Sequence, residues 1–120
     1  MRWLLLLCLG ATAAQAGSQA TYDCRIDRIC IVGETCQAAM DSFVLTPTPE
    51  GYGASIDGDQ VKLRRIAPPA AEMQTFAIAS PDSIAVMLSL LPDGAVIVTI
   101  QEELDGPHAE TMIGQCVQET

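Results

Sequence analysis

Turn-forming residues interrupt the chain at nearly regular intervals. Asp57-Gly58, Pro92-Asp93-Gly94 and Asp105-Gly106-Pro107 each stand between two runs that are suited to β-strands. Asp-Gly pairs accept the positive φ angles of tight turns, and turns about every 8–12 residues are typical of an antiparallel meander. The sequence therefore predicts a single all-β domain of about seven or eight antiparallel strands, closed into a small barrel or sandwich.

Strands are expected wherever apolar, β-branched or alternating residues run between these turns. Apolar Val61 and Leu63 alternate with charged Lys62 and Arg64, which places one face inward and the other toward solvent. The alternation breaks at Arg65, where we expect a bulge or the end of the strand. The predicted strands are 43–45, 52–56, 60–66, 84–91, 95–101 and 109–117.

One segment also fits a helix. Ser80-Pro81-Asp82-Ser83 offers an N-cap, a proline at the first helical position and an acid in the first turn, so 81–91 could form a short helix. We favour a strand, because the β-branched run 95–101 needs a neighbouring strand.

The N-terminus has the features of a secretory signal peptide. Arg2 gives a positive start, residues 3–9 are apolar but too short to span a bilayer as a helix, and Ala14-Gln15-Ala16 fits a peptidase site. We expect cleavage after Ala16, with a cut after Ala20 as the alternative, and a protein of the periplasm or the extracellular space that no membrane retains. The mature chain, 17–120, would consist of a cysteine-rich segment at 22–40 and the β meander at 41–117.

Four cysteines remain after that cleavage: Cys24, Cys30, Cys36 and Cys116. An even number in an oxidising compartment predicts two disulfides, for which three pairings are conceivable. We favour Cys24–Cys116, which ties the two ends of the chain, together with Cys30–Cys36. The spacing fits neither a catalytic dithiol nor a common zinc site.

Charge and composition exclude several functions. The formal net charge is −9, with 15 acidic and 6 basic residues, and only 4% of residues are aromatic. Nucleic-acid binding is therefore not expected. The sequence contains no hydrolase, phosphate-binding or metalloprotease motif, and its single histidine, His108, follows a turn, where we expect a solvated side chain.

These absences favour a non-enzymatic binding protein without a cofactor or a resident metal. Asp57 with Asp59, and Glu102 and Glu103 with Asp105, are the acidic groups that could hold calcium, but their alternation points neighbouring side chains apart. A weak metal or small-ligand binder remains an alternative function.

Two sets of residues are candidates for an interaction surface. The segment 84–100 is apolar at both strand parities, so we expect Met87, Leu91 and Ile97 to lie under the N-terminal segment or to line an interface. The second set is the only basic cluster, which consists of Lys62, Arg64 and Arg65.

Four features follow one another along the chain: a signal peptide, a cysteine after Tyr22-Asp23, a β meander and a cysteine four residues from the C-terminus. This layout is similar to that of small periplasmic lysozyme inhibitors of the c-type-inhibitor family. The resemblance implies an eight-stranded barrel closed by a disulfide, and inhibition of a hydrolase. The Ser-Gly and Tyr loop with which that family plugs the lysozyme cleft has no counterpart here. The nearest stretch, Gly51-Tyr52-Gly53-Ala54-Ser55, has a different order.

Overall fold

A computed structural model describes residues 20–56, 59–68, 70–80, 84–103 and 105–119. The predicted signal peptide, 1–16, lies outside these residues. The chain forms eight strands: β1 (Tyr22–Ile31), β2 (Gln37–Thr48), β3 (Gly51–Ile56), β4 (Asp59–Arg65), β5 (Gln74–Ser80), β6 (Ile84–Leu90), β7 (Ala95–Glu103) and β8 (Pro107–Gln118).

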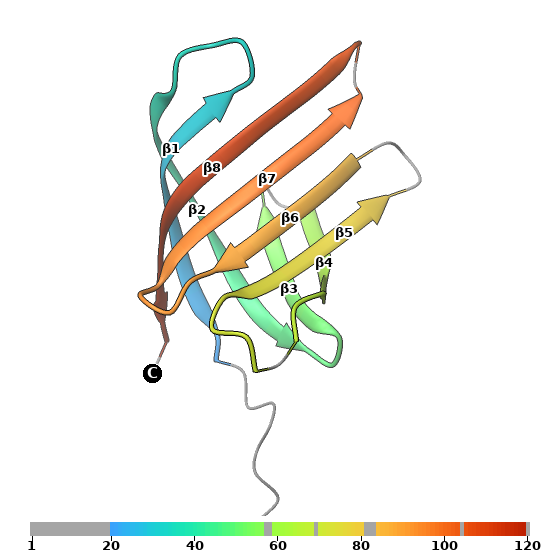
Figure 1. Ribbon diagram of the computed structural model, residues 1–120. Helices are drawn as coiled ribbons and strands as arrows, with labels where there is room; N and C mark the ends of the chain where they lie inside the picture. The colour runs from blue at the N-terminus through green and yellow to red at the C-terminus, as the bar shows by residue number, and fades with distance from the viewer. Residues whose placement is uncertain (1–19, 57–58, 69, 81–83, 104, 120) are drawn as a thin grey trace, which may run out of the picture.

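Each strand pairs antiparallel with its neighbours in the sequence, and β8 pairs with β1, so the sheet closes into a barrel (Figure 1). The predicted all-β meander is therefore confirmed, in its barrel form. Tight turns support it: Gly94, between β6 and β7, has a φ of 92°, and Asp105, between β7 and β8, has a φ of 51°. The Asp93 carboxylate accepts a hydrogen bond of 2.9 Å from the Ala95 amide in the first of these turns.

Alternate residues of the strands fill the barrel. The inward side chains are almost all apolar, which accounts for their burial without hydrogen-bonding partners. The buried core consists of Cys24, Ile26, Phe43, Leu45, Tyr52, Ala54, Leu63, Phe76, Leu88, Leu90, Val96, Val98, Met112 and Cys116.

Three aromatic rings and one cation form a column at the end of the barrel where β3 begins and β4 ends. Tyr22 meets Tyr52 edge to face with ring centroids 6.2 Å apart, and Tyr52 meets Phe76 in the same way at 5.1 Å. The Arg65 guanidinium lies 5.0 Å from the centre of the Phe76 ring. The Tyr52 hydroxyl donates a hydrogen bond of 2.9 Å to the Ala20 carbonyl. This end of the barrel is therefore plugged by side chains.

Burial changes the pKa of Tyr52. Its ring is 4% exposed, and desolvation, reinforced by Tyr22 and opposed by Arg65, raises its pKa from 10.0 to about 12. Because the folded state then holds this proton more strongly than the unfolded state, Tyr52 lowers the stability as the pH rises from about 10 to about 12. Absorbance at 295 nm should show a tyrosine that ionises near pH 12, and Tyr52→Phe should remove that step. A wild-type titration complete by pH 11 would contradict the assignment.

The two disulfides join the cysteine pairs that we favoured, Cys24 with Cys116 and Cys30 with Cys36. Cys24 and Cys116 are direct partners in the β1–β8 ladder, so the bridge locks the first strand to the last from inside the barrel. The second bridge closes the connection between β1 and β2. Two disulfides indicate an oxidising compartment.

Some sequence-based expectations are corrected. Residues 84–90 form a strand, so the helix alternative for 81–91 is wrong over that part, while 81–83 lie outside the described residues. Strand β5 was not expected at all. The cysteine-rich segment, 22–40, contains all of β1 and the first residues of β2. Strand β2 continues through Pro47, which pairs with Tyr52. At Arg65 we expected either a bulge or the end of the strand, and β4 ends there. A bulge is found in β1, between Ile26 and Arg28.

The wall of the barrel has one weakly paired seam, between β4 and β5. Only Arg64 with Ala77 and Arg65 with Phe76 are paired there, whereas each other pair of neighbouring strands shares at least five residue pairs. Beyond Arg64 and Ala77 the two strands diverge (Figure 1).

Candidate binding surface

The outer surface of β5 to β8 is a sheet face on which the only charged residue of the described strands is Glu103, at the C-terminal end of β7. Along each of these strands, residues that alternate with the buried ones point away from the core, and the pairings align them in rows across the sheet. We call this surface the neutral face; its residues are Ala77, Ala85, Met87, Ser89, Ile97, Thr99, Gln101, Thr111 and Ile113. An area without charge is notable in a chain with a net charge of −9.

Met87 and Ile97 are exposed on the neutral face, at 48% and 37%. The expectation that the N-terminal segment covers them is not met by the described part of the chain, in which β1 is separated from β6 by two strands. The other expected arrangement, an interface, remains a prediction. Leu91 follows β6 and is half-buried, and its amide donates to the Ala95 carbonyl across the turn.

An open groove of about 540 Å³ lies on the neutral face beside β4. The paired residues Arg64 and Ala77 both line it, so the groove lies where the β4–β5 seam begins. The remaining lining is mostly apolar and consists of Ile66, Ile78, Ala85, Val86, Met87, Thr99 and Gln101.

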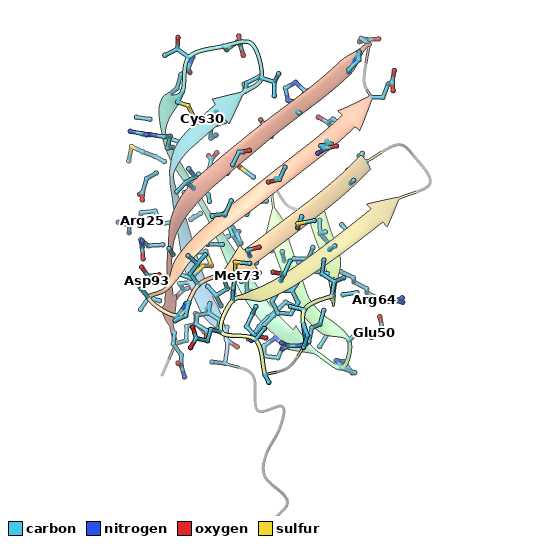
Figure 2. The ribbon with its side chains drawn as sticks, viewed as in Figure 1. Arg25, Cys30, Glu50, Arg64, Met73 and Asp93 are labelled. Carbon is cyan, nitrogen blue, oxygen red and sulfur yellow. A yellow bond between two sulfur atoms is a disulfide. The ribbon has the colours of Figure 1, made fainter. Side chains whose placement is uncertain are left out.

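The predicted basic cluster divides between two environments. Lys62 and Arg64 are exposed on the outer face of β4, and Arg64 is aligned with Ala77 and Met87 in one row. Its guanidinium is 3.9 Å from the Glu50 carboxylate, and both side chains are exposed (Figure 2), so this ion pair contributes little to stability. Arg65 has the opposite parity and lies over Phe76. The structure thus brings Arg64 next to the neutral face. Lys62 lies on the same outer face of β4 but pairs with no described residue of β5, and Arg65 points to the other side.

The single histidine is not a free loop side chain. His108 is the second residue of β8 and is half-buried, with its Nε2 3.6 Å from a Glu110 carboxylate oxygen. Glu102 is its direct partner on β7. Glu103, the next residue, is exposed, as the predicted alternation of these two glutamates requires. Asp105 stands in the turn before β8.

A second hollow of about 770 Å³ lies on the outer surface of β8, β1, β2 and β3. Asp23, Arg25 and Asp27 line it together with Ser42 and Gln115. Its charged groups are of both signs and lie on strand positions that face solvent. This arrangement is typical of an ordinary solvated surface.

The stretch nearest to the lysozyme-inhibitor loop is part of a strand. Gly51–Ile56 is β3, and Tyr52 within it points into the core. Tyr52 is therefore unavailable to enter the cleft of another protein, although the eight-stranded barrel and the Cys24–Cys116 bridge agree with the fold that the resemblance implies.

The residues that the structure describes contain neither a metal-binding cluster nor a membrane-spanning helix. In them no three His, Cys, Asp or Glu side chains are arranged to hold a metal ion. The same residues include no helix with the length and hydrophobicity needed to cross a membrane.

No protein-family profile, curated protein sequence or solved structure matches this chain.

Proposed function

We propose that this protein is a secreted, non-enzymatic binding protein that recognises a partner protein through the neutral face and the adjoining cations of β4. The observation that carries the proposal is the neutral face, on which Met87 and Ile97 are exposed and Met87 lies in the same row as Arg64. The core of a protein–protein interface is depleted in charge, and its rim is polar. The neutral face and the edge formed by Lys62 and Arg64 have this arrangement.

The proposed location follows from the N-terminal sequence and the disulfides. The charged start, the apolar run and Ala14-Gln15-Ala16 support export with cleavage after Ala16. The two bridges support the periplasm or the extracellular space as the destination.

Substituting the centre of the neutral face tests the proposal. Met87→Lys should reduce the capture of the partner from a periplasmic or secreted extract of the native host by about tenfold, because a charge would be buried in the interface. The free energy of unfolding should change by no more than about 0.5 kcal/mol, because the half-exposed lysine reaches water. Capture is quantified with tagged mature protein, and stability is measured by urea denaturation.

Val44→Lys is the matched control. Val44 is an outward residue of β2 with 37% exposure, and three strands separate β2 from β6, the strand of Met87, in either direction around the barrel. It should leave capture unchanged. Equal capture by Met87→Lys and wild type would show that the neutral face is ordinary solvent-exposed surface. A larger elution volume of Met87→Lys on a sizing column would identify the partner as a second copy of the chain.

Inhibition of a hydrolase is a second candidate function. It is favoured by the barrel and by the bridge between β1 and β8, which agree with the resemblance to periplasmic lysozyme inhibitors. Since Tyr52 is buried, such an inhibitor would use another surface. Slower cell-wall lysis by a c-type lysozyme in the presence of stoichiometric mature protein would support this function, and an unchanged rate would exclude it for that enzyme.

A further inference from the structure

The seam between β4 and β5 leaves backbone groups without a neighbouring strand. Among the residues that the structure describes, 59–63 of β4 and 78–80 of β5 have no partner in the β4–β5 ladder, whose pairs are Arg64 with Ala77 and Arg65 with Phe76. Unpaired strand edges bind other extended chains by adding a strand to the sheet.

The direction of these backbone groups follows from hydrogen bonds at the lower end of the seam. The Arg65 amide donates to the Glu50 carbonyl, on the β3 side, at 2.9 Å, and the Ile66 amide donates to the Thr75 carbonyl of β5 at 2.9 Å. Because neighbouring residues of a strand direct their backbone groups to opposite edges, Gln60 and Lys62 direct theirs toward β5. By the same rule, Ala79 directs its backbone groups toward β4, as Thr75 does.

The side chains beside the seam define what an added strand would carry. Lys62 is exposed on the outer face, with Arg64 one position further along that face. A residue directly opposite Lys62 or diagonal to it in an added strand would have its side chain on the same face, within reach of both cations. Acidic side chains fit this outer side.

The inner side of the seam is apolar. Val61 of β4 and Ile78 of β5 are half-buried and pack against the edge of the core. The residue of an added strand that lies opposite Val61 would point inward, because its parity matches that of Val61. Aliphatic side chains fit this inner side.

From these observations we infer that the seam binds an extended segment of the partner protein as an added β-strand, in which acidic residues face outward and aliphatic residues face inward. The inference rests on the proposed partner-binding function and adds the element and the ligand chemistry. The unpaired stretch of β4 matches a segment of about five residues, or about 17 Å.

Amide hydrogen exchange with a defined peptide tests the inference. The probe is a capped peptide of about five residues in which Glu and Val alternate, and the protein is the mature chain with both disulfides intact. At millimolar peptide, the amides of Gln60, Lys62 and Ala79 should exchange at least about tenfold more slowly, since they gain backbone partners. The amides in the centre of β6 should not change.

Two comparisons distinguish this recognition from non-specific peptide binding. A peptide of the same length that alternates Lys and Val should give no protection. Lys62→Glu combined with Arg64→Glu should reduce the protection by the Glu–Val peptide at least about tenfold. The matched control, Arg25→Glu with Arg28→Glu, makes the same charge change on the exposed face of β1 and should retain it; Arg25 and Arg64 lie on opposite sides of the view in Figure 2.

Three results would overturn the inference: no protection of these amides by the Glu–Val peptide, equal protection by the Lys–Val peptide, or amides at the seam that are already as protected in the free protein as those of β6. If the Glu–Val peptide gave no protection, the role of Lys62 would be to prevent edge-to-edge pairing of this strand with other chains. Because the assay uses a synthetic peptide, it can fail while Met87→Lys still abolishes capture of the partner, so the two proposals are tested separately.

Discussion

Replacement of both Cys24 and Cys116 by alanine should lower the free energy of unfolding by about 4–5 kcal/mol. The bridge spans 92 positions of the sequence, and a cross-link that closes so long a loop removes much of the conformational entropy of the unfolded chain. Its sulfurs also fill part of the core, since both cysteines are buried. Urea denaturation of the oxidised variant and of the wild type measures the difference.

The pair Cys30 and Cys36 provides the comparison. Their bridge spans only 6 positions, so replacing both by alanine should lower the free energy of unfolding by only about 2–2.5 kcal/mol. If the two double variants lost equal stability, loop entropy would not be the reason for the effect, and contacts around the bridges would have to account for it.

Gly114→Ala should cost about 3 kcal/mol of stability or prevent folding. Gly114 lies in β8 directly opposite Ile26, beside the bulge of β1. A Cβ atom at this position would stand 1.9 Å from the Arg25 carbonyl oxygen and 2.8 Å from the Ile26 Cα. These are backbone atoms, so β1 and β8 would have to separate where the barrel closes.

Gly53→Ala is the matched control for that prediction. Gly53 is also a strand glycine, but a Cβ there would meet its nearest atoms, in Thr48 and Thr46, at 3.7 and 3.8 Å, which is ordinary contact. Its stability should stay within about 1 kcal/mol of the wild type. Thermal denaturation of both variants tests the pair, and a Gly114→Ala protein as stable as Gly53→Ala would show that β8 can shift without loss.

Much of the fold could be predicted because its determinants are local. The Pro92-Asp93-Gly94 and Asp105-Gly106-Pro107 turns mark the end of β6, both ends of β7 and the start of β8, and the β-branched run at 95–101 forms most of β7. The disulfide pairing was also foreseen, since a meander that closes on itself brings its first and last strands together.

Strand β5 could not be predicted from the same signals. Its sequence, Gln74 to Ser80, contains the β-formers Thr75, Phe76 and Ile78, but the connection before it lacks a tight-turn motif that would mark where a strand begins. Its place is decided by pairing with β6 along the whole strand. The predicted strand at 43–45 was too short, because β2 extends from Gln37 through Pro47 to Thr48.

The candidate surface was predictable in part. The sequence singled out Met87 and Ile97, but it predicted that the N-terminal segment or an interface covers them, whereas both are exposed in the single chain. The outward position of Lys62 and Arg64 followed from the alternation in β4. Arg65 lies apart from Lys62 and Arg64 because its guanidinium packs on the Phe76 ring. Phe76 is distant in the sequence, so no local pattern predicts this contact. The open seam depends on the register between β4 and β5, which is a property of the closed barrel and not of either strand.

The Cys24–Cys116 bridge also constrains the order of events when the chain is made. A polypeptide emerges N-terminus first, so Cys24, Cys30 and Cys36 become accessible to oxidants together, long before Cys116 follows. Thiol–disulfide exchange favours whichever thiols are near each other at the time, and Cys24 then has only wrong neighbours. Correct maturation therefore requires either that Cys24 stay reduced until β8 arrives or that an early mispairing be reshuffled.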